Sequence, residues 1–322
     1  MKFKFKIGFV FLIIGLISCK NQKKELNETE TKQQEVAEQT ENNPVIRHIR
    51  TADPSAHIWE DGKVWMYTSQ DMEDATFYDS MDGYHAFSST DMVNWTDHGE
   101  VLHSRDIPWG AKGWMWAPTA IYKNNKYYLI YPHSVKGTKE DMRCGVAVSD
   151  VPEGPFKDIG WIEGVEGQWL DPCVFEDEDG KVYLYWGVRE PKVALLKDNL
   201  LELVEAPRPI EYGGKNFFEA SYMHKYKGKY YFSYNAGLGG FYAMGDSPYG
   251  PFEYKGGLNP KQRQDHHSIV EYKGQNYFFY HWQGWNGGSK FRRNTAIEYL
   301  YYNEDGTIKE IYATKEGVSK VE

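Results

Sequence analysis

Short runs of aromatic and β-branched residues, each closed by a turn signal, fill the chain after residue 44. The turns are Asp-Gly, Asn-Asn and Lys-Gly pairs, which favour tight hairpins. One such unit runs from His57 through Asp61 and Gly62 to Tyr67. Apolar residues at helical spacing are scarce over the same region. The pattern therefore predicts an all-β fold built from hairpins.

The hairpin unit recurs with a period of about fifty residues, and each copy begins with a short motif. The motifs are Ala-Asp-Pro-Ser at 52–55, Trp-Ala-Pro-Thr at 116–119, Leu-Asp-Pro-Cys at 170–173, Phe-Glu-Ala-Ser at 218–221 and Asp-His-His-Ser at 265–268. A second hairpin follows the first, which gives four strands per unit. This is the composition of a propeller blade, whereas a β-sandwich does not repeat in this way. We therefore predict a five-bladed β-propeller over residues 46–322.

The second residue of each motif is expected to begin the innermost strand of its blade. These residues are Asp53, Ala117, Asp171, Glu219 and His266. Innermost strands surround the central axis, so the five positions should approach one another. An Asp before Pro is also an ordinary turn former, but that explanation would have to hold separately at four of five matching positions. The repeat predicts one pocket that contains three carboxyl groups and a histidine.

Three carboxyl groups in a small volume repel one another when ionised, so their pKa values spread apart. One group can then donate a proton while another remains a base. Hydrolysis of a glycosidic bond needs such an acid and such a base. A calcium or manganese site is the alternative, but the sequence lacks an EF-hand spacing, and calcium prefers oxygen ligands to histidine. The pattern favours a hydrolase.

Composition and charge agree with a saccharide ligand. The formal net charge is −9 and the pI is about 5.6, which argues against a nucleic-acid partner. Aromatic residues make up 16% of the chain, with 11 Trp and 25 Tyr. Many of these residues suit β-strands, and some could stack on sugar rings. Cys144 and Cys173 are expected to be buried thiols.

The N-terminus has the pattern of an export signal. Three lysines within residues 1–6 precede an apolar stretch at 7–17 that is short for a membrane span. Leu-Ile-Ser-Cys at 16–19 resembles a bacterial lipobox. We therefore predict a lipoprotein signal peptide at 1–18 and a lipid anchor on Cys19, a secretory signal with an incidental cysteine being the alternative. The polar residues 19–45 predict a flexible tether. The expected location is the bacterial cell envelope, at the outer membrane or facing the periplasm.

Several of these motifs resemble glycoside hydrolase family 43. They are Ala-Asp-Pro-Ser at 52–55, Leu-Asp-Pro at 170–172, Phe-Phe-Glu-Ala-Ser-Tyr at 217–222, Trp-Ala-Pro at 116–118, and the segments 149–156 and 265–271. The resemblance covers about residues 46–315. It implies an inverting hydrolase in which Asp53 is the general base, Glu219 is the general acid, and Asp171 tunes and orients the acid. An oligosaccharide is the expected partner, and the chemistry needs no cofactor.

The same resemblance suggests roles for other pocket residues. His266 is similar to a channel histidine that contacts a calcium ion through water, and a hydrogen-bonded axial histidine without metal is the alternative. Arg293 is expected to reach the substrate pocket. Trp116 and Phe218 are candidate stacking walls, with core packing as the alternative. Many family members have Asp where this chain has Thr119, which leaves the fine specificity open.

The segments 217–226 and 302–306 look like the β-xylosidase branch of the family. They imply an exo-acting enzyme on xylose-containing plant or algal oligosaccharides. An α-L-arabinofuranosidase is the alternative within the family. A non-catalytic glycan-binding propeller is the alternative outside it, and that function predicts the loss of a central acid, whereas all three are present. We expect a monomer.

Overall fold

The computed structural model describes residues 41–138, 141–168, 170–214, 216–237, 239–259, 266–284 and 287–322. The predicted signal peptide, Cys19 and nearly all of the predicted tether lie outside the described residues. Asn42–Glu322 forms a compact unit. Within this unit the Asn43 side chain is buried and hydrogen-bonds to Ile297 and Glu298. None of the described residues forms a helix long and apolar enough to cross a membrane.

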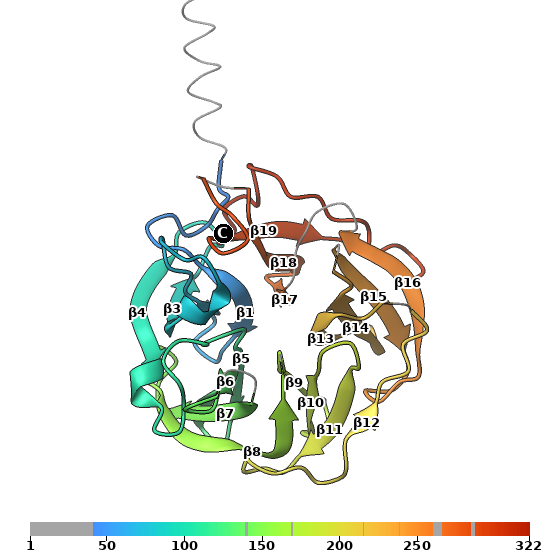
Figure 1. Ribbon diagram of the computed structural model, residues 1–322. Coiled ribbons are helices and arrows are strands. Elements are labelled where there is room, and N and C mark those ends of the chain that lie inside the picture. The colour runs from blue at the N-terminus through green and yellow to red at the C-terminus, as the bar shows by residue number, and fades with distance from the viewer. Residues whose placement is uncertain are drawn as a thin grey trace, which may run out of the picture. The chain divides into compact units, whose positions relative to one another are not determined.

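Five antiparallel sheets surround a central axis, as Figure 1 shows. The first contains β1 (Ala52–Ile58), β2 (Val64–Ser69), β3 (Gly83–Ser89) and β4 (Thr96–His103), with the 3-10 turns η1 (Tyr78–Ser80) and η2 (Ser104–Asp106). The second contains β5 (Thr119–Lys123), β6 (Lys126–Ser134), β7 (Met142–Ser149) and β8 (Lys157–Gly167). The third contains β9 (Cys173–Glu176), β10 (Val182–Trp186), β11 (Lys192–Leu196) and β12 (Arg208–Pro209). The fourth contains β13 (Glu219–Tyr226), β14 (Lys229–Asn235), β15 (Gly240–Gly245) and β16 (Phe252–Asn259). The fifth contains β17 (His267–Tyr272), β18 (Gln275–Trp282) and β19 (Asn294–Leu300).

This arrangement confirms the predicted all-β, five-bladed propeller. Within each blade the strands pair in chain order, and the first strand lies nearest the axis. The prediction of four strands per blade is wrong for the fifth blade, which has three among the described residues. The N-terminal segment lies along its outer edge instead. Val45 N–H donates to Thr295 O at 3.0 Å, and Ile297 N–H donates to Asn43 Oδ1 at 2.9 Å. The start of the domain therefore covers the edge that its last blade leaves open.

The apolar core lies between neighbouring blades. Five buried clusters occur, one at each junction from blades 1 and 2 round to blades 5 and 1. Along β2, for example, Val64 and Met66 belong to one cluster and Trp65 and Tyr67 to the next, as expected for a sheet that is packed on both faces by its neighbours. Cys144 and Cys173 are buried free thiols in two of these clusters, as predicted. The blades therefore hold one another in place and fix the relative positions of the inner strands.

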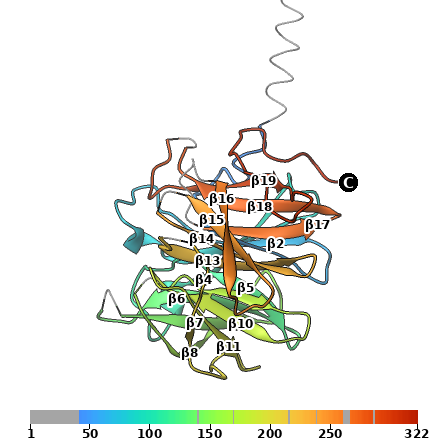
Figure 2. The same ribbon diagram turned by 90° about the vertical axis from the view of Figure 1, so that its right-hand side faces the viewer.

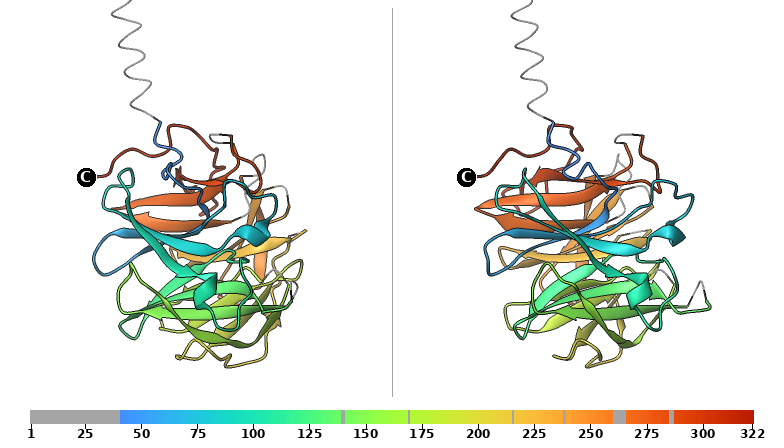
Figure 3. Two further views of the ribbon diagram at one scale, coloured as in Figure 1. Left: turned by 60° about the vertical axis from the view of Figure 1, so that its left-hand side comes forward. Right: turned by 90° about the vertical axis from the view of Figure 1, so that its left-hand side faces the viewer.

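Side-chain hydrogen bonds join the inner strands halfway along the axis. Ser268 Oγ donates to Pro54 O at 2.8 Å and accepts from Ala56 N–H at 2.9 Å. Tyr222 OH donates to Ile269 O at 2.9 Å and accepts from Ile269 N–H at the same distance. Cavities lie toward each end of the inner strands, and they share no lining residue. The pocket described below lies at the end where these strands begin, and its lining includes Tyr78 of η1. Figures 2 and 3 show the blades from the side, with the loop that carries η1 projecting from them.

Candidate active site

The three acids lie at or beside a backbone irregularity at the start of their inner strands. Asp53 and Asp171 have left-handed φ angles of 52° and 41°. A non-glycine residue adopts this conformation only when the surrounding structure imposes it. In β1 the strand pairing shifts between Ala52 and Ser55, which is the signature of a bulge. The bulge redirects a side chain that would otherwise follow the simple alternation of the strand.

The fourth blade has the same bulge, but Glu219 lies one residue earlier than predicted. Glu219 pairs with Asn235, as Ala52 pairs with Ser69, and the strand register then shifts as it does in β1. The structural counterpart of Asp53 is therefore Ala220, whose φ is 61°. The predicted equivalence of Glu219 with Asp53 and Asp171 is wrong by one position. The longer Glu side chain still brings its carboxyl group into the same pocket.

The pocket has a volume of about 270 Å³. Its lining includes every residue singled out from the sequence. These are the acids Asp53, Asp171 and Glu219, the aromatic residues Trp116 and Phe218, and His266 and Arg293. The lining also contains Phe77, Tyr78, Met81, Ala117 and Lys290. A cavity of this size, largely apolar with a few convergent polar groups, is typical of a site for a small sugar unit.

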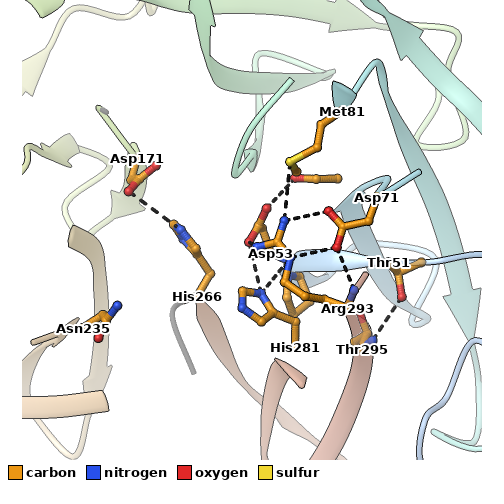
Figure 4. A network of polar contacts seen from close by, with 12 residues as sticks. Thr51, Asp53, Asp71, Met81, Asp171, Asn235, His266, His281, Arg293 and Thr295 are labelled. Atoms are coloured by element: carbon orange, nitrogen blue, oxygen red, sulfur yellow. Dashed lines mark hydrogen bonds and ion pairs between the residues drawn. The ribbon is translucent and has the colours of Figure 1, made fainter. Parts of the chain in front are cut away.

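A network of charged and polar contacts surrounds Asp53 (Figure 4). Arg293 Nη1 donates to Asp53 Oδ1 at 3.0 Å, and Ser69 Oγ donates to Asp53 Oδ2 at 2.8 Å. His281 Nδ1 lies 3.1 Å from both the backbone N and Oδ1 of Asp53. Arg293 is held in turn by Asp71, which accepts from its Nε and Nη2 at 2.8 Å each. The arginine fork thus bridges two carboxylates in a fixed geometry.

This network controls the charge of Asp53. Burial raises the pKa of the carboxyl group, but Arg293 opposes this effect, together with His266 and His281, and the pKa lies well below its usual range. For Arg293, burial lowers the pKa, whereas Asp53 and Asp71 raise it well above the ordinary value. Asp53 is therefore held as an anion beside the Arg293 cation.

The opposite side of the pocket is arranged differently. His266 Nε2 lies 3.8 Å from Asp171 Oδ2, as Figure 4 shows. Asn235 Nδ2 donates to Glu219 Oε1 at 3.4 Å, a long hydrogen bond. Glu219 and Phe218 are half-buried, whereas Asp171 is buried. The carboxyl group of Glu219 is accordingly more open to the pocket than that of Asp53.

Aromatic residues from separate loops form one wall. Trp116 Nε1 donates to the carbonyl of Tyr78 at 2.9 Å, and the two rings meet edge to face with centroids 6.5 Å apart. The Tyr78 ring also packs on Phe291 at 4.7 Å. Exposed faces of such residues can stack on a sugar ring. Thr119, in contrast, does not line this pocket and contributes to the cavity at the other end of the axis.

Sequence reasoning missed several residues around the acids. Ser69 and Asn235 end the second strands of their blades, and each hydrogen-bonds the acid of its own blade. His281 is the residue before the last one of β18, the second strand of blade 5. Extending the repeat from the first to the second strand of each blade would have found them. Asp71 lies in a loop beyond β2 and has no counterpart in the other repeats, so no repeat signal marks it. Its importance follows only from its contacts with Arg293.

The described residues do not supply a direct calcium site beside His266. None of their His, Cys, Asp and Glu side chains form a group of three or more that could hold a metal. The Arg293 guanidinium already occupies one carboxylate oxygen of Asp53 and both of Asp71. Calcium needs six to eight oxygen ligands. The residues present do not fit a directly coordinated ion.

A pocket that contains several carboxyl groups, one of them held ionised, has the groups that hydrolysis of a glycosidic bond requires. Comparison with known proteins agrees. The Glycosyl hydrolases family 43 profile matches residues 41–308. Xylosidase/arabinosidase 43A of Humicola insolens is 38% identical over 325 residues, covering 82% of this chain and 98% of that protein. The xylosidase/arabinosidase of Bacteroides ovatus is 37% identical, covering 80% and 93%.

A solved structure is similar over the same region. The family 43 β-xylosidase/α-arabinofuranosidase from a compost microbial metagenome, in complex with xylotriose and in a calcium-free form, is 37% identical with a TM-score of 0.75. The alignment covers 84% of this chain and 96% of that one. The chain belongs to glycosyl hydrolase family 43, and the protein is a glycoside hydrolase.

Proposed function

We propose that this protein is an exo-acting, inverting β-xylosidase that acts on xylose-containing oligosaccharides. In this proposal Asp53 is the general base that activates water, Glu219 is the general acid that protonates the leaving oxygen, and Asp171 tunes and orients the acid. The observation that carries the assignment is the environment of Asp53. A carboxylate fixed by Arg293, Ser69 and His281 and kept ionised can accept a proton from water.

The position of Glu219 supports its role as the acid. Its half-buried carboxyl group lies in the same pocket as Asp53 but on a different blade. An inverting mechanism needs an acid and a base on opposite sides of the sugar, with room for a water molecule. Asp53 and Glu219 lie on blades 1 and 4, which are not neighbours in the ring, and this placement supports such a separation. Asp171 on blade 3 lines the pocket between them in blade order.

The exo mode is supported by the shape of the site. The pocket and the cavity at the other end of the inner strands share no lining residue. A saccharide that enters the pocket along the axis would therefore present its end to the acids. Two relatives carry xylosidase/arabinosidase names, and a similar structure contains xylotriose. An α-L-arabinofuranosidase activity in the same pocket is the second candidate, which these names favour.

Product analysis tests the proposal. The purified protein is incubated with p-nitrophenyl β-xyloside, p-nitrophenyl α-L-arabinofuranoside and xylotriose, and the first-formed sugar is followed by proton NMR. We expect xylose released from the non-reducing end with α configuration, the inverted anomer. Release of the β-anomer would contradict the inverting mechanism. Binding of xylotriose without cleavage of any substrate would favour the glycan-binding alternative.

We also propose that the mature enzyme is a monomer, anchored by lipid through Cys19 in the bacterial cell envelope. The lipobox-like Leu-Ile-Ser-Cys at 16–19 and the polar residues after it support the anchor. Cys19→Ala should move the enzyme from the membrane fraction to the soluble fraction of a bacterial host. Unchanged fractionation, with no incorporation of labelled palmitate in the wild type, would contradict the anchor.

Sedimentation of the detergent-solubilised protein tests the oligomeric state.

A further inference from the structure

A tight turn places a lysine at the pocket. Ser289 N–H donates to Arg292 O, and Arg292 N–H donates to Ser289 O, both at 3.1 Å. Ser289 Oγ also accepts from Phe291 N–H at 3.2 Å. The next residue, Arg293, is fixed by its backbone and side-chain bonds to the buried Asp71. The turn is therefore built directly onto the pocket network, and Lys290 lies at its tip.

The side chain of Lys290 has a defined place at the pocket. It is exposed to solvent and lines the same cavity as the three acids. Its Nζ lies 4.5 Å from the centroid of the Phe291 ring, a cation–π distance. Phe291 packs in turn against Tyr78 at 4.7 Å and Phe77 at 6.0 Å. The aromatic wall thus supports the lysine at the side of the opening.

Among the described residues, no carboxylate neutralises the charge of Lys290. In the part of the chain that the structure describes, no carboxylate lies within 4.0 Å of its Nζ. Other lysines have such partners, including Lys126 with Asp150 and Lys229 with Asp246. Arg293 is the other permanent cation of the lining, and Asp53 and Asp71 neutralise it. Lys290 therefore offers a single positive charge to whatever enters the pocket.

We propose that Lys290 forms an anionic subsite that binds the carboxylate of a uronic acid carried by the leaving part of the oligosaccharide. The inference rests on the proposed function, because it assumes a saccharide in the pocket. The net charge of −9 and the three central acids repel an acidic glycan, so its binding needs a local cation. One ammonium group matches one carboxylate in charge.

Three matched substrates test the subsite. They are xylotriose, xylotriose with glucuronic acid on its middle xylose, and the methyl ester of that acid. The variants are Lys290→Gln, which removes the charge, and Lys290→Arg, which keeps it. Lys309→Gln is the control, because Lys309 is exposed and does not line the pocket. The readout is the kcat/KM for the acidic substrate divided by that for its ester.

We expect Lys290→Gln to lower this ratio about fivefold, the upper range for one exposed ion pair. Lys290→Arg should keep most of the ratio, and Lys309→Gln should leave it unchanged. In the wild type the ratio should fall as salt is added. An unchanged ratio in Lys290→Gln, or an equal loss on all three substrates, would overturn the subsite.

A binding measurement separates this inference from the proposed function. The acidic trisaccharide and its ester are titrated into Asp53→Asn and into Asp53→Asn/Lys290→Gln by calorimetry. We expect the second variant to lose the preference for the acid. If that preference depends on Lys290 while the wild type cleaves no xyloside, the subsite stands and the xylosidase proposal fails. If xylotriose is cleaved and no preference for the acid exists, the xylosidase proposal stands and the subsite fails.

Discussion

Blades 1 and 4 each bring an acid into the pocket from the same bulge, yet they surround it differently. Ser69 and Asn235 occupy matching positions on the second strands, and each hydrogen-bonds the acid of its blade, at 2.8 Å to Asp53 and 3.4 Å to Glu219. Only in blade 1 do the described contacts add the Arg293–Asp71 pair. The same backbone device therefore supports two carboxyl groups with different environments, as two different proton-transfer roles require.

The largest effect is expected from removing the base. Asp53→Asn keeps the size of the side chain but cannot accept a proton from water. We expect kcat to fall about 10³-fold on every substrate, including activated aryl xylosides, because each needs the water to be activated. Initial rates on p-nitrophenyl β-xyloside and xylobiose provide the measurement. A loss below about tenfold on both would show that Asp53 is not the base.

Removing the cation should make Asp53 resemble an ordinary buried acid. The double variant Asp71→Asn/Arg293→Gln deletes both members of the pair, which avoids leaving Asp71 as an unpaired buried charge. Without Arg293, burial dominates and raises the pKa of Asp53. The base is then protonated at low pH, so activity is lost as the pH falls.

We expect the acid limb of the pH–kcat/KM profile to move upward by about one unit or more. The rate at neutral pH should fall about tenfold to a hundredfold, because Arg293 also positions Asp53. Thermal unfolding confirms that the variant is folded. A folded variant with an unshifted acid limb would contradict control of Asp53 by Arg293.

The smallest effect is expected from Ser69→Ala, which removes one hydrogen bond to Asp53. A bond to a charged group contributes about 1.5 kcal/mol or more, so a loss of about tenfold in kcat/KM is the expected size. Ser88→Ala is the matched control, since Ser88 is also buried but hydrogen-bonds His98 instead. Equal losses in the two variants would indicate a general effect on the fold.

The repeat was sufficient to predict the fold and the composition of the pocket, because blade period and motif position are sequence properties. Details that depend on irregularities of the backbone could not be predicted from the sequence. In the structure Glu219 lies one residue before the counterpart of Asp53, whereas the aligned motifs place the two acids at the same position. Blade 5 has three strands among the described residues, and residues 42–45 lie along its outer edge, which the repeat did not predict. Asp71 and Lys290 come from loops without repeats, so only three-dimensional contacts identify them.

The most direct test of the account compares Glu219→Gln with Asp53→Asn across leaving groups. If Glu219 is the acid, Glu219→Gln should lower kcat about 10³-fold on xylobiose. On p-nitrophenyl β-xyloside it should lower kcat about tenfold or less, because p-nitrophenolate leaves without protonation. Asp53→Asn should lower kcat by about the same factor on both substrates. Equal losses on the two substrates in Glu219→Gln would contradict the division of roles between blades 1 and 4.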